Sequence, residues 1–298
     1  MRVLHHISDL HFGKLDPLVA EGLVADLTAQ PCDLLVISGD FTQRARAGQY
    51  QAAANFRQRL PGPQLVVPGN HDIPLFDVLR RFGAPLQFYK RYISDDLRPF
   101  YRDDEIAVLG INSARSLTWS ARGFWKDGAI SREQLADVST RMANIPESVF
   151  KVVVTHHPFI PPPHKRSHGI VRGAGRALAQ MEASGVDLLL AGHLHMAYGG
   201  DVRTHHEAIK ASILSVQAGT ATSTRRRGEP NAYNRITIDN DRVEVAVRAW
   251  DGEKFQRTVV TEYRRVDHIW VPQEQRGVEP AGVAEGSTPL ASEAVKGN

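Results

Sequence analysis

The chain has 298 residues, a net charge of +3 and 42% hydrophobic residues, a composition that excludes disordered and fibrous proteins. No stretch approaches the ~20 apolar residues of a membrane span, the N-terminus shows no leader pattern, and the single cysteine, Cys32, excludes an internal disulfide. We therefore expect a cytoplasmic protein without a membrane span, and the weak positive charge does not establish a nucleic-acid partner.

Strand and helix patterns alternate through the first two thirds of the chain. The apolar runs predict strands at 4–7, 34–37, 64–67, 106–111, 152–154 and 186–191. Helical spacing and capping residues predict helices at 18–27, 47–60 and 74–82, one that opens at 131–135, and one at 176–183. This alternation indicates an α/β domain.

The pattern changes in the last third of the chain. Residues from about 213 to 265 show strict alternation and turn signals, which predict antiparallel strands joined by hairpins. Residues 272–298 are rich in Gly, Pro, Ala, Ser and Glu, which is typical of a loosely ordered tail. We therefore expect one domain over 1–271 and a C-terminal tail over 272–298.

Five predicted strands end in side chains of the kind that bind metal ions. These side chains are Asp9 with His11, Asp40, Asn70, His156, and His193 with His195. Because ligands bind at the carboxyl ends of strands in α/β sheets, we expect all of them to meet in one crevice. The spacing of two within each pair places both side chains on the same side of an extended backbone.

These seven donors are more than one tetrahedral metal site uses, and two ions that share Asp40 would use them all. Imidazole and carboxylate donors without a cysteine suit zinc, iron or manganese. Two such ions ~3.5–4 Å apart can clamp the attacking and leaving oxygens of a displacement at phosphorus. The sequence therefore predicts dinuclear phosphoester chemistry.

The motifs resemble, in order and spacing, those of the calcineurin-like metallophosphoesterase superfamily, and within it the bacterial cyclic-nucleotide phosphodiesterase-like (class III) branch. They are Asp9-x-His11, Gly39-Asp40, Gly69-Asn70-His71-Asp72, His156 and Gly192-His193-x-His195. The resemblance covers residues 9–195. It implies a catalytic domain over 1–271 with a four-layer α/β/β/α sandwich fold, in which two central sheets are flanked by helices. Residues 213–265 would supply antiparallel strands of the second sheet.

The resemblance also implies a role for each site residue. One metal ion would be held by Asp9, His11, Asp40 and His195, and the other by Asp40, Asn70, His156 and His193. Asp40 and His71 would be the catalytic residues, Asn70 and His71 would contact the substrate phosphate, and His71 would donate a proton to the leaving group. His157 is a further candidate for substrate contact, and Asp72 would support the loop from outside the metal shell.

The expected function is hydrolysis of a phosphodiester by a metal-bridging hydroxide, with a small diester such as a 3′,5′-cyclic nucleotide as the leading substrate. A phosphomonoesterase, a DNA nuclease of the same superfamily and a non-catalytic scaffold on the same fold stay open as alternatives. A small-molecule partner is favoured over nucleic acid, and a homodimer is expected because related proteins are often dimers. The Arg225–Arg227 run is interpreted as a solvated loop, and the roles of the Trp119–Trp125 loop and the tail stay open.

Overall fold

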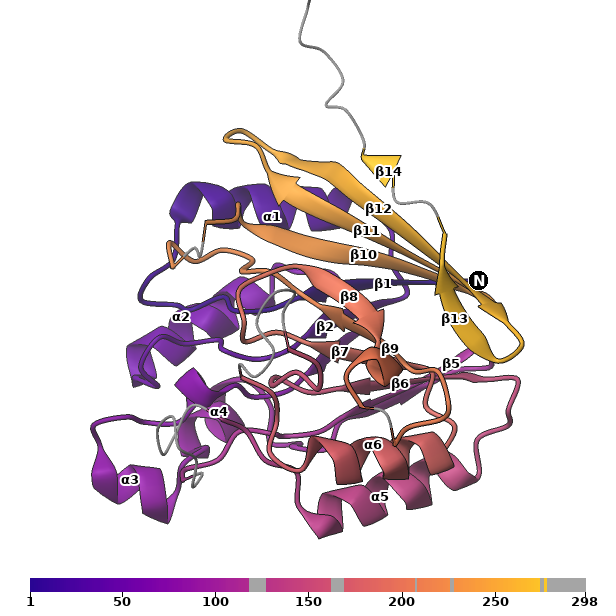
Figure 1. The fold of residues 1–298 in the computed structure, drawn as a ribbon. Helices are drawn as coiled ribbons and strands as arrows, with labels where there is room; N and C mark the ends of the chain where they lie inside the picture. Colours follow the sequence, from indigo (N-terminus) through magenta and orange to yellow (C-terminus); the bar gives the residue numbers. More distant parts are fainter. Residues whose placement is uncertain (118–126, 162–168, 207, 226–227, 274–275, 278–298) are drawn as a thin grey trace, which may run out of the picture.

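The computed structural model describes the whole chain except residues 118–126, 162–168, 207, 226–227, 274–275 and 278–298. In this part of the chain two β-sheets lie face to face, and helices cover the outer face of each sheet (Figure 1). This arrangement confirms the predicted four-layer α/β/β/α sandwich. None of the described helices is long and apolar enough to cross a membrane.

The first sheet has the strand order β13-β12-β11-β10-β1-β2-β3, with β14 paired to β12. Its N-terminal strands β1, β2 and β3 are parallel, so their carboxyl ends lie at one edge of the sheet. The bounds are β1 Arg2–Ile7, β2 Leu34–Ile37, β3 Gln64–Val66, β10 Ala232–Asp239, β11 Arg242–Trp250, β12 Phe255–Val266, β13 Ile269–Pro272 and β14 Arg276–Gly277.

The second sheet has the strand order β4-β5-β6-β7-β9-β8. Strands β5, β6, β7 and β9 are parallel, and the short strands β4 and β8 pair antiparallel at the two edges. The bounds are β4 Phe100–Arg102, β5 Ile106–Gly110, β6 Phe150–Val154, β7 Leu188–Ala191, β8 Tyr198–Asp201 and β9 Leu214–Gln217.

Helices α1, α2 and α4 pack on the first sheet, and α5 and α6 pack on the second. Helix α1 begins where the sequence predicts, because Asp16 accepts hydrogen bonds from the backbone N–H groups of Leu18 and Val19 and Pro17 occupies the first turn. The bounds are α1 Pro17–Ala29, α2 Ala47–Arg57, α3 Val78–Gly83, α4 Gln87–Tyr92, α5 Arg132–Ala143 and α6 Ala174–Ala183, with short 3₁₀ helices η1 Asn70–Asp72 and η2 Val202–Thr204.

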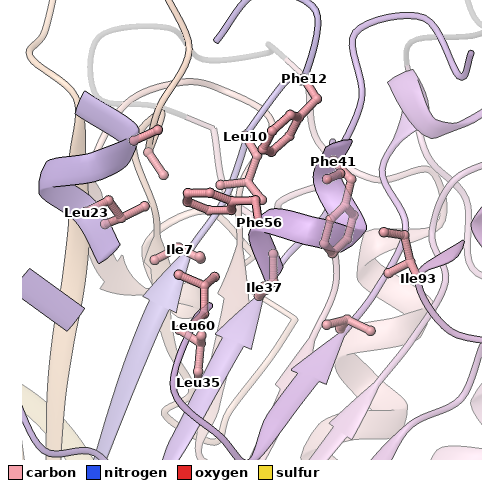
Figure 2. Close-up of a cluster of buried hydrophobic side chains, with 14 of the residues drawn as sticks. Ile7, Leu10, Phe12, Leu23, Leu35, Ile37, Phe41, Phe56, Leu60 and Ile93 are labelled. Carbon is pink, nitrogen blue, oxygen red and sulfur yellow. The ribbon is translucent and has the colours of Figure 1, made fainter. Parts of the chain in front are cut away.

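Apolar side chains fix the loops that follow the strands of the first sheet. Figure 2 shows Leu10, Phe12 and Phe41, from the loops after β1 and β2, in the same cluster as Ile37 of β2 and Phe56 of α2. The three loop residues are at most 6% exposed. Each buried side chain of this size contributes roughly 1.5–3 kcal/mol. The loops that carry the candidate site therefore rest on the hydrophobic core.

The expectation that residues 213–265 belong to the second sheet is wrong for most of that segment. Of the described strands in this segment, only β9 lies in the second sheet, where it is parallel to β7. Strands β10, β11 and β12 extend the first sheet, because β10 pairs antiparallel with the edge of β1 that β2 leaves open. Alternation predicts a strand and a hairpin, but it carries no information on which sheet edge the hairpin joins.

Strand pairing also continues beyond residue 272, where the tail was expected to begin. Gly277 of β14 lies opposite Val259 of β12, and Arg276 lies opposite Val260. The rest of the expected tail, 278–298, lies outside the described residues.

Candidate metal centre

The loops after β1 and β2 are joined by backbone hydrogen bonds directly beneath the site. The N–H of Asp9 donates to the carbonyl of Gly39 at 3.1 Å, and the N–H of His11 donates to the carbonyl of Asp40 at 2.9 Å. The loop after β3 contacts the loop after β2 at Gly69, where an added Cβ would lie 2.1 Å from Oδ1 of Asp40. Only glycine fits at this approach, so the sequence brings three ligand-bearing loops together.

The backbone at the candidate ligands is left-handed rather than extended. The φ angles of Asp9, His11 and Asp40 are 58°, 50° and 54°, and those of His193 and His195 are 72° and 58°. The expectation that extended backbone aligns each spaced pair is therefore wrong, because each pair lies in a tight turn after its strand. Asp9 and His11 still meet, whereas His193 and His195 fall into different groups of donor atoms.

The first group of donor atoms comes from Asp9, His11 and His195. Oδ1 of Asp9 lies 3.3 Å from Nε2 of His11 and 3.6 Å from Nε2 of His195. Oδ2 of Asp9 is held by the hydroxyl of Ser8 at 2.7 Å and the N–H of His193 at 3.0 Å. Among the described residues, Oδ1 of Asp9 and both ring nitrogens of His11 have no hydrogen-bond partner, although both residues are buried. Buried donor atoms that converge without partners fit a bound cation.

Asp40 lies at the junction between this group and the next. Its Oδ2 is 3.6 Å from Nε2 of His11 and 3.4 Å from Nε2 of His156. Its Oδ1 accepts the N–H of His71 at 2.8 Å, which fixes the carboxylate plane. One oxygen of Asp40 therefore faces both groups of donors, as a shared ligand must.

The second group surrounds His156. Its Nδ1 donates to the carbonyl of Ser38 at 2.7 Å, which leaves Nε2, 3.1 Å from Oδ1 of Asn70, available as a ligand atom. Donor atoms of His156, His157 and His193 all lie within 4.8 Å of one another. His157, which the sequence left without a clear assignment, therefore lies beside this group, with Nδ1 2.8 Å from the hydroxyl of Ser113.

Electrostatics keep the carboxylates of the site ionised. Burial opposes ionisation of Asp40, yet the imidazoles of His156 and His71 hold the pKa of its carboxyl well below the usual range. Burial likewise opposes the charged form of His156, but the carboxylate of Asp40 raises the pKa of His156 to about 9. The site therefore stabilises positive charge at Nε2 of His156, the atom at which a metal ion would take the place of a proton.

Asp72 links two of the loops from behind the site. Its carboxylate accepts the N–H groups of Phe41, Thr42 and Gly69 at 3.2, 2.9 and 2.9 Å. Burial and then the charge of Asp40 raise the pKa of Asp72 to about 7, and the three N–H donors oppose that shift. Asp72 is fully buried and lies outside the groups of candidate ligands, and its supporting role stays a prediction.

His71 lies at the edge of a pocket of about 620 Å³. Its Nδ1 is 3.0 Å from the carbonyl oxygen of Gln43, which can only accept, so Nδ1 carries a hydrogen. Its Nε2 is 3.1 Å from Nη1 of Arg225, which can only donate. The ring is therefore neutral in this arrangement, and burial lowers the pKa of His71.

Arg225 is the main site residue that sequence reasoning missed. We interpreted the Arg225–Arg227 run as a solvated loop, but Arg225 is half-buried and contacts His71. The run of arginines was the signal in the sequence that could have pointed to this residue. Its spacing does not indicate which arginine turns inward. Arg226, Arg227 and the whole Trp119–Trp125 loop lie outside the described residues.

Comparison with known sequences identifies one family and one curated relative. A family model described as calcineurin-like phosphoesterase matches residues 1–197. Glycerophosphodiester phosphodiesterase GpdQ from Enterobacter lignolyticus (strain SCF1) is 30% identical over 175 residues, which are 53% of this chain and 58% of that protein. The similarity thus spans a little more than half the length of this relative.

Comparison with solved structures shows the same fold in two phosphatases. The purple acid phosphatase PPD1 from yellow lupin (Lupinus luteus) seeds has a TM-score of 0.62 at 10% identity, covering 86% of this chain and 52% of that one. A dimetal phosphatase from Danio rerio has a TM-score of 0.60 at 11% identity, covering 83% of this chain and 96% of that one. At these identities the likeness concerns the fold alone.

Proposed function

The chain belongs to the calcineurin-like phosphoesterase family, and from this premise we propose that it is a metal-dependent phosphoric ester hydrolase that hydrolyses phosphodiesters at a two-metal centre. The single observation that best supports the proposal is the position of Asp40, with Oδ2 3.6 Å from His11 and 3.4 Å from His156. The proposed ligands are Asp9, His11, Asp40 and His195 for one ion, and Asp40, Asn70, His156 and His193 for the other.

The chemistry of the donor set supports two divalent or trivalent ions, for which manganese, iron and zinc are the candidates. When bound, the metal pair supplies an acidic water as nucleophile and neutralises charge that develops at phosphorus. Hydrogen bonds hold the carboxylates of Asp40 and Asp9 in place for both proposed metal positions. The N–H of His71 donates to Oδ1 of Asp40, and the N–H of His193 donates to Oδ2 of Asp9.

His71 and Arg225 are the proposed substrate contacts, together with Asn70. The guanidinium of Arg225 already donates toward His71, so it lies where a phosphate oxygen could accept from it. As a proton donor, His71 would carry the transferred proton on Nε2, the nitrogen that now faces Arg225. The negative charge of a bound phosphate favours that protonated form, since it raises the pKa of the ring from its lowered value.

A small phosphodiester is the proposed substrate class. The name of the curated relative, a glycerophosphodiester phosphodiesterase, favours a diester over a monoester. A 3′,5′-cyclic nucleotide stays our leading specific substrate from the sequence, with a phosphomonoester or DNA as alternatives. The non-catalytic scaffold stays the less favoured alternative, because all seven ligand-type side chains are present in the sequence. A cytoplasmic location and a homodimer stay predictions.

The test is metal content together with turnover. We expect purified protein to contain about two metal ions per chain, to lose turnover of bis(p-nitrophenyl) phosphate on chelation, and to recover it with Mn²⁺. Full activity in a protein shown to be free of metal would contradict the proposal.

His71→Gln tests the proton-donor assignment. We expect the variant to keep its metals and to lose at least ~100-fold more turnover on a diester with an alkyl leaving group than on a p-nitrophenyl diester, since nitrophenolate leaves without protonation. Equal losses on both substrates would show that His71 contacts the phosphate without donating a proton.

A further inference from the structure

The pocket beside His71 is lined by an excess of cations. Five basic residues line its volume of about 620 Å³, and no aspartate or glutamate is among its described lining residues. These cations are Lys14, Arg44, Arg46, Arg81 and Arg225. Together they exceed the net charge of the whole chain, which is +3. The pocket therefore carries a positive local charge that its own described lining does not balance.

None of these five cations forms an ion pair with a carboxylate in the part of the chain that the structure describes. Arg225 contacts His71 and Gln43, and Arg44 lies 5.5 Å from the ring centre of Phe76. By contrast Arg80, the residue before Arg81, does not line the pocket and forms an ion pair with Asp77 at 3.5 Å. A group of unpaired cations at one pocket attracts an anion that the chain itself does not supply.

Arg81 makes this point most strongly because it is only 7% exposed. Among the described residues, its guanidinium donates one hydrogen bond, from Nη1 to the carbonyl of Pro74 at 2.7 Å. Burial without a carboxylate partner is costly for a guanidinium, and it lowers the pKa of Arg81. An anion that enters the pocket would offset this cost.

Helix α2 adds to the positive potential because it begins at this pocket. Arg46 is its N-cap residue and makes no side-chain capping hydrogen bond, and Gln49 of the first turn lines the pocket. The N–H groups of the first helical turn therefore contribute their dipoles to the same volume.

A simple diester does not account for this charge. It carries one negative charge, which the proposed metal centre with Asn70 and His71 already accommodates. The pocket volume lies in the usual range for a small-molecule site and suits a group of nucleotide size. We propose, on the basis of the function proposed above, that the substrate is a small phosphodiester bearing at least one further phosphate group, which the pocket cations bind.

This proposal separates the candidate substrates by charge. A 3′,5′-cyclic nucleotide or a glycerophosphodiester with a neutral alcohol leaves Arg44, Arg46 and Arg81 without a partner. A phosphodiester of a nucleotide-sized group that carries a second phosphate satisfies them.

The test compares two substrates that differ by one phosphate. The first is the p-nitrophenyl ester of thymidine 5′-phosphate, and the second is the same ester with an added 3′-phosphate. The scissile bond and leaving group are identical, so a difference in kcat/KM reports the extra phosphate. With Mn²⁺-loaded protein we expect kcat/KM to be at least ~10-fold higher for the second substrate.

Variants assign the preference to the pocket. The double variant Arg44→Gln/Arg46→Gln should lower the ratio of the two kcat/KM values at least ~5-fold, because it removes two cations from exposed or half-exposed positions. The matched control is Arg59→Gln, which removes a cation that pairs with Glu21 beyond the far end of α2 and should keep the wild-type ratio. Equal kcat/KM values for both substrates in the wild type would overturn the proposal.

Binding to the metal-free protein separates this proposal from the catalytic one. We expect thymidine 3′,5′-bisphosphate to bind at least ~10-fold more tightly than thymidine 5′-phosphate in calorimetry, and the double variant to remove the difference. If the protein hydrolyses neither ester, the proposed function fails while this binding result still decides the inference. Affinity for oligothymidylates that keeps rising beyond the dinucleotide would overturn the small substrate in favour of single-stranded DNA.

Discussion

Asp72→Asn tests whether the candidate centre depends on a carboxylate that touches none of its proposed ligand atoms. Asp72 accepts four hydrogen bonds, from the N–H groups of Phe41, Thr42 and Gly69 and from the hydroxyl of Thr42. In asparagine one acceptor oxygen becomes an NH₂ donor. If the NH₂ group takes the place of Oδ1, it faces the N–H of Thr42. If it takes the place of Oδ2, it faces the N–H groups of Phe41 and Gly69.

At least one buried N–H group therefore loses its acceptor in either orientation of the amide. That loss costs about 1–3 kcal/mol. The charge itself adds nothing to this cost, because burial and Asp40 already disfavour the ionised form of Asp72. We expect the free energy of unfolding to fall by about 1–3 kcal/mol. Because the lost bonds join the loop of Asp40 to the loop of Asn70, we expect metal affinity to fall roughly 10–100-fold.

Urea unfolding followed by circular dichroism measures the stability of the metal-free proteins, and calorimetric titration with Mn²⁺ measures metal affinity. The control is Asp137→Asn on α5, which breaks a partly exposed pair with Arg141 at 3.0 Å and should cost less than about 1 kcal/mol. An Asp72→Asn protein that equals the wild type in both measurements would refute the reasoning, since the four hydrogen bonds would then have no consequence.

Two further predictions concern a close approach and a buried imidazole. Gly69→Ala places a Cβ 2.4 Å from the backbone nitrogen of Asp40, so turnover should fall at least ~10-fold. The control is Gly48→Ala in α2, where the added Cβ meets no described atom within 4 Å and should stabilise the protein by about 0.5–1 kcal/mol in thermal unfolding. Normal turnover of Gly69→Ala would contradict the clash. Burial and then the charge of Arg235 lower the pKa of His5 to about 4, so below pH 6.5 the unfolded chain takes up a proton that the folded chain refuses, and stability falls as the pH drops toward 4. Between pH 7 and 4.5 wild-type protein should lose roughly 2–3 kcal/mol more than His5→Phe in urea unfolding, and parallel pH profiles would exclude this assignment.

Sequence reasoning located the strands and the polar residues at their ends because both signals are local. The run Leu34–Ile37 indicates a buried strand, and the glycines before Asp40 and Asn70 indicate tight loops, without any knowledge of the partner strands. Features that depend on distant contacts were not predictable in the same way. The edge of β1 that receives β10, and the inward turn of Arg225 toward His71, are set by segments about 150 to 230 residues away in the chain.

Local conformation at the ligands was also hidden, for a different reason. The spacing of Asp9 and His11 fits an extended strand as well as it fits two left-handed residues in a turn, and only tertiary contacts select the second. Histidine and aspartate adopt positive φ more readily than most residues but far less readily than glycine. Their presence alone therefore does not predict a left-handed turn.

The left-handed backbone at five proposed ligands has a consequence for the evolution of such chains. Each non-glycine residue at these φ angles costs roughly 1 kcal/mol, so the positions Asp9, His11, Asp40, His193 and His195 together disfavour the folded chain by several kcal/mol. Glycine at any of them would relieve that cost and remove a ligand in one step. We therefore expect a descendant that no longer needs the metal centre to gain stability by replacing these residues with glycine.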